Sequence, residues 1–240
     1  MGKMRSPEIA AQLANLAAMS DDDIDTDDIP EAPAENWAFA RRPGLCRAVK
    51  TGDPTAPRAM RLTVDDLVLL DREWSKSDRY HSTELIDGVI YHTPARYGPR
   101  ARATMELFCR LREALEALGI GYQVLTRASI ALSPFDLPLP DVLVVREETS
   151  DDFIPGHVVA LIVEIAESNL PFFLEAKQHL YARCGIPEYW VVDLTENRVL
   201  MHANPRGDGS GYDGQLDVPF GEPLYAATVE GLTVDSGGLD

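Results

Sequence analysis

The segment that most restricts the fold is VVALIVEIA at residues 158–166, in which eight of nine residues are apolar. A short apolar run rich in Val and Ile predicts a strand that is buried on both faces of a sheet. Glu164 lies inside this run, and a buried carboxylate is costly unless it is paired or binds a metal ion. The fold must therefore supply a partner for Glu164. The alternative to a functional site is a buried Arg or Lys that pairs with it for packing alone.

The remaining patterns predict alternating helices and strands. Thr63 and Asp66 form a capping box for a helix that runs to about residue 72, and Asp87-Gly88 is a hairpin turn signal. Helices are predicted over residues 98–118 and 171–184, the first with an apolar face of Met105, Phe108, Leu111, Leu115 and Leu118. Strands are predicted over residues 122–132, 141–145, 188–194 and 197–205, followed by short edge strands. This order indicates an α/β fold, with helices on the faces of a mixed sheet.

The first 60 residues have a different character. A short helix is predicted over residues 6–19, and the acidic stretch DDDIDTDDIPEAPAEN follows at residues 21–36. Such a composition cannot bury enough apolar surface to fold by itself. We therefore expect a partly disordered N-terminal extension over residues 1–60 and one domain over residues 61–240.

Charge and composition limit the partners. The formal net charge is −17, and residues 61–240 hold 15 Lys and Arg against 29 Asp and Glu. Because phosphate contacts dominate nucleic-acid affinity, binding to DNA would need a local basic stripe, an oligomer, a partner or divalent cations. The three cysteines are far apart, which suggests neither a disulfide framework nor a zinc site. No apolar run approaches the roughly 20 residues of a membrane helix, so we expect a cytoplasmic protein without a membrane partner.

A second carboxylate strengthens the case for a site. Asp141 stands directly before the strand DVLVV, and with Glu164 and the carbonyl of Ile165 it would form a hard oxygen site for Mg²⁺ or Mn²⁺. Lys177, on the following helix, is the candidate cation beside the metal, and Tyr181 lies one turn later on the same face. Taken singly, Asp141 also fits a strand-start residue and Lys177 a solvated helix lysine.

Four blocks carry a resemblance to a known family: TELIDGVIY, LPLPDVLVV, LIVEIAES and EAKQHLYARCGIPEYWVVDL. In this order they resemble the Uma-two family of restriction endonucleases over residues 61–232. The resemblance implies the restriction-endonuclease-like fold of the PD-(D/E)XK superfamily, with Glu84, Asp141, Glu164 and Lys177 as site residues. Glu84 is implied as a further metal ligand. The superfamily's usual lysine position, two residues after the glutamate, is Ala166 here, so the lysine comes from the helix.

The chain departs from the family pattern in two places. Phe172-Phe173-Leu174 stands where relatives often carry an aspartate before the helix lysine, and Glu167 stands where a small polar or acidic residue is common. The extension separately resembles the start of small bacterial antitoxin-like proteins, through its DIPE segment at residues 28–31.

These observations lead to three functional hypotheses. The first is a Mg²⁺-dependent endonuclease that hydrolyses DNA phosphodiester bonds, in which a homodimer would place a site on each strand. The second is a non-catalytic protein that uses the same fold as a binding or regulatory module, which the acidic charge favours. A small-molecule α/β enzyme has little support, because the sequence contains no phosphate-binding glycine loop and no nucleophile elbow.

Overall fold

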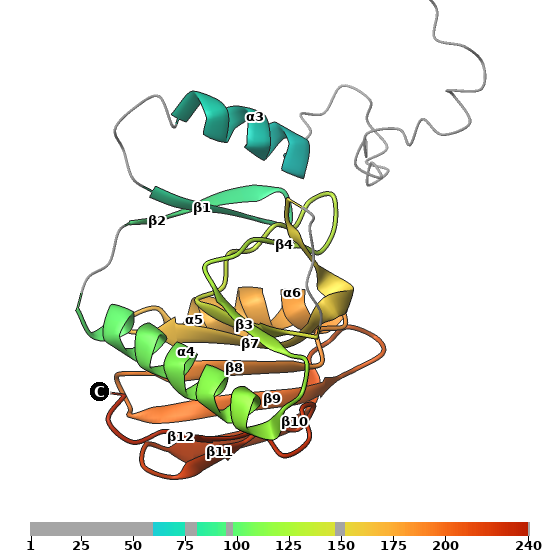
Figure 1. Ribbon diagram of the computed structural model, residues 1–240. Coiled ribbons are helices and arrows are strands. Elements are labelled where there is room, and N and C mark those ends of the chain that lie inside the picture. The colour runs from blue at the N-terminus through green and yellow to red at the C-terminus, as the bar shows by residue number, and fades with distance from the viewer. Residues whose placement is uncertain (1–59, 75–80, 95–97, 147–151, 240) are drawn as a thin grey trace, which may run out of the picture. The chain divides into compact units, whose positions relative to one another are not determined.

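The computed structural model describes residues 60–74, 81–94, 98–146 and 152–239 (Figure 1). The predicted extension lies outside these residues except for Met60, so its disorder and its resemblance to antitoxins stay predictions. In the part of the chain that is described, no helix combines the length and the apolar character needed to cross a membrane.

A six-stranded mixed sheet forms the centre of the domain. Its strand order is β10-β9-β8-β7-β5-β3, in which β7 and β8 are parallel and all other neighbours are antiparallel. All eight residues of β7 are buried, which confirms the predicted central strand. The bounds are β3 Gln123–Thr126, β5 Val142–Val145, β7 Val159–Ala166, β8 Glu188–Asp193, β9 Arg198–Pro205 and β10 Tyr212–Pro219.

Helices cover both faces of this sheet (Figure 1). The long helix α4 (Pro99–Leu118) packs on one face, together with the small β11–β12 pair. The other face is covered by one continuous helical segment made of α5 (Leu170–Phe172), a π-helical turn η3 (Phe173–Lys177) and α6 (Gln178–Arg183). The short remaining strands and 3₁₀ turn are β4 Ile130–Ala131, β6 Ile154–Pro155, η2 Gly156–Val158, β11 Pro223–Tyr225 and β12 Thr233–Asp235.

A helix and a hairpin precede the sheet. The helix α3 (Val64–Trp74) begins at the predicted capping box, in which Thr63 and Asp66 exchange hydrogen bonds of 2.7–3.2 Å. The hairpin strands are β1 (His81–Ile86) and β2 (Val89–Pro94), joined at Asp87-Gly88 as predicted. Reciprocal backbone hydrogen bonds of 3.1 and 2.8 Å tie Leu85 of β1 to Leu137. These bonds hold the hairpin, and therefore Glu84, beside the main sheet.

Three details differ from the sequence predictions. The buried positions of α4 are Ala103, Leu107, Leu111 and Leu115, whereas Met105 and Leu118 of the predicted face are 59% and 39% exposed. The buried residues of α4 follow one another at intervals of four and form the stripe that packs against the sheet. Apolar residues beside this stripe stay at the surface. The single strand predicted over residues 122–132 is broken, because Arg127 has a φ of 50° and turns the chain away from the sheet. The third difference is the π-helical turn inside the predicted helix 171–184.

The hairpin turn offers a direct test of this arrangement. Gly88 has a φ of +74°, and an added Cβ would lie 2.5 Å from Cβ of Arg61. We expect Gly88→Ala to lower the free energy of unfolding by about 1–3 kcal/mol, measured by urea denaturation. Gly121→Ala is the control, because nothing lies within 4 Å of its added Cβ, and it should change stability by less than about 0.5 kcal/mol. Equal stabilities of the two variants would show that the positive φ and the close approach of Arg61 do not require glycine at position 88.

Candidate active site

Two neighbouring strands bring the predicted carboxylates together. Asp141 directly precedes β5, and Glu164 lies in β7, where Val163 is the register partner of Val142. The Oδ2 atom of Asp141 accepts a hydrogen bond of 2.8 Å from the backbone N–H of Ile165. Because this bond bridges the two strands beside Glu164, both acids belong to one site.

Lys177 lies in the same site and is not a solvated helix residue. Its Nζ atom is 2.7 Å from Oε1 of Glu164 and 2.8 Å from Oε2 of Glu84, and its side chain is only 2% exposed. The hydroxyl of Tyr181 donates a 3.0 Å hydrogen bond to the same Oε1 of Glu164. The structure therefore places Glu84, Glu164, Lys177 and the predicted supporting Tyr181 in one buried cluster. Asp141 lies next to this cluster, bonded to the backbone of Ile165.

A π-helical turn carries this lysine. Residues 173–177 form the turn, and Lys177 is its last residue. A π-turn inserts one extra residue into the helix, and such turns are frequent at functional sites. The inserted residue changes which side chains face the sheet along the rest of the segment. Lys177 and Tyr181 are four residues apart, a spacing that places side chains on one face of a helix, and both contact Glu164.

The electrostatics follow from burial and from this pairing. The pKa of Glu164 is raised to about 7, chiefly by burial and also by the negative charges of Asp141 and Glu84, against the opposing effect of Lys177. Burial by itself would lower the pKa of Lys177, but Glu164 and Glu84 outweigh it and raise that pKa. Lys177 therefore stays charged, and Glu164 binds a proton at a higher pH than an exposed glutamate does.

One buried oxygen of this network has no hydrogen-bond partner. Oε2 of Glu164 is buried and has no hydrogen-bond partner, although its twin Oε1 accepts two hydrogen bonds. Within the described ranges, no three His, Cys, Asp or Glu side chains are grouped as a ready metal site. Glu84 forms a 2.8 Å ion pair with Lys177, and its role as a metal ligand stays a prediction. The residues that fit a hard divalent cation are thus Asp141, the free Oε2 of Glu164 and a backbone carbonyl, for which Ile165 is the predicted source.

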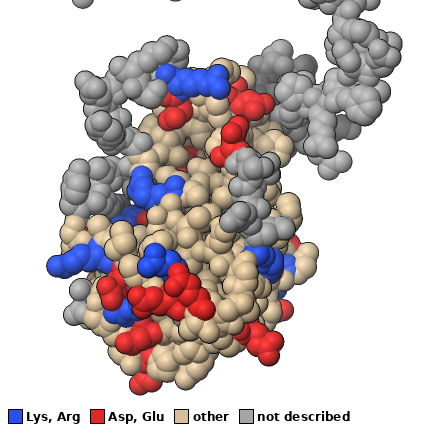
Figure 2. All heavy atoms as spheres, viewed as in Figure 1, with Lys and Arg blue, Asp and Glu red and all other residues tan. Residues whose placement is uncertain are grey.

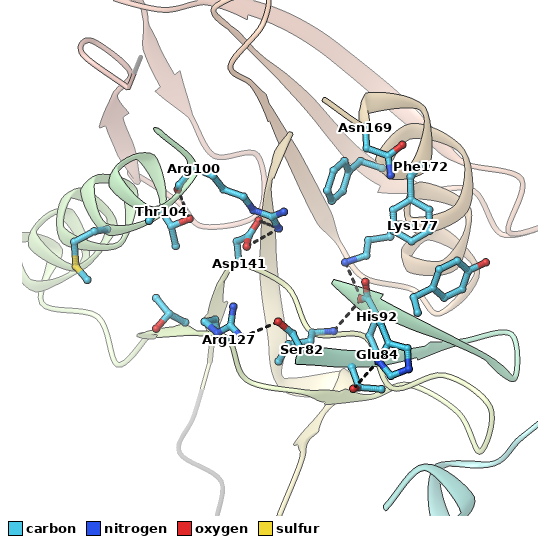
Figure 3. Close-up of a pocket in the computed structure, with 17 residues that line it drawn as sticks. Ser82, Glu84, His92, Arg100, Thr104, Arg127, Asp141, Asn169, Phe172 and Lys177 are labelled. Carbon is cyan, nitrogen blue, oxygen red and sulfur yellow. Dashed lines mark hydrogen bonds and ion pairs between the residues drawn. The ribbon is translucent and has the colours of Figure 1, made fainter. Parts of the chain in front are cut away.

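The site opens into a cleft of about 490 Å³ between β1–β2, α4 and the helical segment (Figure 3). Two arginines that the sequence analysis missed line it. Arg100, in the first turn of α4, places one guanidinium nitrogen 2.8 Å from both carboxylate oxygens of Asp141. Arg127 donates a 2.9 Å hydrogen bond to Ser82. Only the fold reveals them, because an arginine in a helix start or after a strand is ordinary in a sequence.

Aromatic side chains form another wall of the cleft. Tyr91 of β2 and Phe172 have ring centroids 5.1 Å apart, and Phe173 lies next to them. Phe172 and Phe173 are the residues that depart from the family pattern before Lys177. Their rings, instead of an acidic side chain, therefore face whatever enters the cleft.

The mixed sheet thus carries two acids on adjacent strands, and a buried lysine from the covering helical segment lies beside them. The chain belongs to the Uma2 family, whose description is "Putative restriction endonuclease" and whose model matches residues 65–235. This match confirms the family resemblance, and the mixed sheet with helices on both faces confirms the predicted α/β fold class. A solved structure, a putative nuclease belonging to DUF820 from Anabaena variabilis, is similar at 14% identity and a TM-score of 0.49, covering 68% of this chain and 88% of that chain. No curated protein matches the chain.

Proposed function

We propose that this protein is a Mg²⁺- or Mn²⁺-dependent endonuclease that hydrolyses phosphodiester bonds in DNA. The observation that carries the proposal is the unpartnered, buried Oε2 of Glu164 beside Asp141. A buried carboxylate oxygen without a partner is costly, and a bound cation would remove that cost. The family to which the chain belongs supports the same class of reaction.

The residues have separate roles in this proposal. Asp141, Glu164 and the carbonyl of Ile165 would hold the cation, which would supply Lewis-acid stabilisation of the phosphoryl oxygens and activation of water. Lys177 keeps its positive charge beside the reacting phosphate and so stabilises the charge that develops there. Glu84 holds Lys177 in place from the hairpin side through the 2.8 Å ion pair. Tyr181 fixes the orientation of Glu164.

The charge of the chain favours a different function. On the face shown in Figure 2, Lys and Arg side chains of the described residues are separated by acidic and uncharged ones and form no continuous stripe. A non-catalytic binding or regulatory protein is therefore the second candidate. In the endonuclease proposal, the bound cation and the cleft residues Arg100 and Arg127 supply the local positive charge, and a homodimer would supply two sites for a duplex.

Cleavage of supercoiled plasmid separates the two functions. The full chain is incubated with plasmid and Mg²⁺ or Mn²⁺ at low and moderate salt, beside Asp141→Asn and Asp213→Asn. We expect nicking by the wild type and a loss of at least about a hundredfold for Asp141→Asn, because its carboxylate would hold the cation. Asp213 pairs with Arg206 at the surface with a side chain 69% exposed, so its variant should cut normally. Absence of nicking by the wild type in both metals would rule out the endonuclease.

A further inference from the structure

Arg100 holds the carboxylate that the cation needs. Its guanidinium nitrogen lies 2.8 Å from Oδ1 and 2.8 Å from Oδ2 of Asp141, while Oδ2 also accepts the hydrogen bond from Ile165. The side chains of Arg100 and Asp141 are only 13% and 10% exposed, so solvent screens the pair weakly. Both oxygens of Asp141 are thus already engaged by a positive charge.

The guanidinium of Arg100 and a bound metal ion would therefore compete for the carboxylate of Asp141. A divalent ion coordinated by Asp141 would lie close to the guanidinium of Arg100. Two positive charges that are close together repel strongly in a site that solvent screens weakly. Lys177 already occupies Oε1 of Glu164 and Oε2 of Glu84. The oxygen of Glu164 that has no partner is Oε2, which the proposed cation would use, so it is not available to the arginine once the metal is bound. Arg100 must therefore leave Asp141, at least in part, when a metal ion binds.

The surroundings of Arg100 leave room for its guanidinium to move away from Asp141. The residue lines the open cleft and lies near the Phe173 ring, whose centroid is 5.9 Å from its guanidinium carbon. It sits in the first turn of α4 on a long, unbranched side chain, so its head can move without a change in the helix. Guanidinium groups bind phosphate oxygens through paired hydrogen bonds. A phosphate in the cleft is the natural acceptor once Asp141 is released.

We propose that Arg100 is an internal competitor of the metal: it neutralises Asp141 in the metal-free protein and turns to the substrate phosphate when the metal binds. This inference rests on the proposed endonuclease function, because that function supplies the metal and the phosphate. The effect is reciprocal, since the Arg100–Asp141 pair weakens metal binding by the same factor by which bound metal weakens the pair. Arg100 thereby links occupation of the metal site to capture of the substrate.

Calorimetric titration with Mn²⁺ alone tests the competition without any reaction. The full chain is compared with Arg100→Gln, which removes the charge and keeps a helix-forming side chain, and with Arg100→Lys. We expect Arg100→Gln to bind Mn²⁺ about tenfold more tightly than the wild type, with Arg100→Lys between the two. Arg110→Gln is the matched control, because it removes an arginine–carboxylate pair from the same helix outside the cleft, and its affinity should be unchanged. Asp141→Asn should abolish the difference.

Plasmid cleavage at saturating Mn²⁺ gives the second half of the test. Arg100→Gln should cut more slowly than the wild type in spite of its tighter metal binding, because the phosphate contact is lost. Equal or weaker Mn²⁺ binding by Arg100→Gln, or by Arg100→Lys if the first variant does not fold, would overturn the competition even if the wild type cuts DNA. Tighter binding in a protein that never cuts DNA would support the competition and reject the endonuclease.

Discussion

Replacing Lys177 with methionine is expected to lower the free energy of unfolding by about 3–5 kcal/mol at pH 8 in metal-free protein. The side chain is 2% exposed and lies between Glu164 and Glu84, at 2.7 and 2.8 Å. Without it, two buried carboxylates would face each other with no cation between them. Urea denaturation with a chelator present measures the loss. The loss should shrink at pH 5, because Glu164 is then largely protonated.

A double variant shows whether this charge is the cause. Glu164→Gln combined with Lys177→Met removes one of the two acids together with the lysine, so it should be more stable than Lys177→Met alone. Arg206→Met serves as the control at an exposed pair with Asp213, where a loss below about 1 kcal/mol is expected. If the double variant is no more stable than Lys177→Met, lost packing and not the unpaired acids explains the effect.

Replacing Glu164 with glutamine should reduce DNA cleavage by about a thousandfold or more while leaving the protein folded, a loss of roughly 4 kcal/mol in transition-state stabilisation. Glutamine has the same shape and retains an oxygen that accepts hydrogen bonds from Lys177 and Tyr181. It loses the charged oxygen that has no partner and that the proposed cation would use. Plasmid nicking under matched metal concentrations measures the loss.

The same variant makes a prediction about pH. The pKa of Glu164 is raised by burial from 4.5 to about 7, so the folded protein holds this proton more tightly than the unfolded chain does. The wild type therefore loses stability as the pH rises from about 4.5 through 7, whereas glutamine does not titrate. In chelator, Glu164→Gln should gain stability relative to the wild type across this window, by on the order of 1–3 kcal/mol. A constant difference between pH 5 and pH 8 would contradict the raised pKa.

The sequence predicted the site residues more fully than it predicted their contacts. Glu164 stood out because an acid inside an apolar strand needs a partner, and the structure supplies Lys177 and Tyr181. The alternative in which Lys177 is solvated is wrong, since its side chain is buried. Glu84 was linked to the site by family resemblance alone, and its contact with Lys177 depends on how Leu85 pairs with Leu137, 52 residues away.

What the sequence determined by itself was local. Apolar runs, the capping box at Thr63 and the turn at Asp87-Gly88 predicted the elements, because strands, caps and turns depend on neighbouring residues. Only the tertiary structure showed the break at Arg127, the π-turn that ends at Lys177 and the pairing of Arg100 with Asp141. The last of these joins two charges that are 41 residues apart in the chain and share a weakly exposed space. The spacing of apolar residues along the chain does not reveal contacts between distant residues. The proposed chemistry of this protein depends on such contacts.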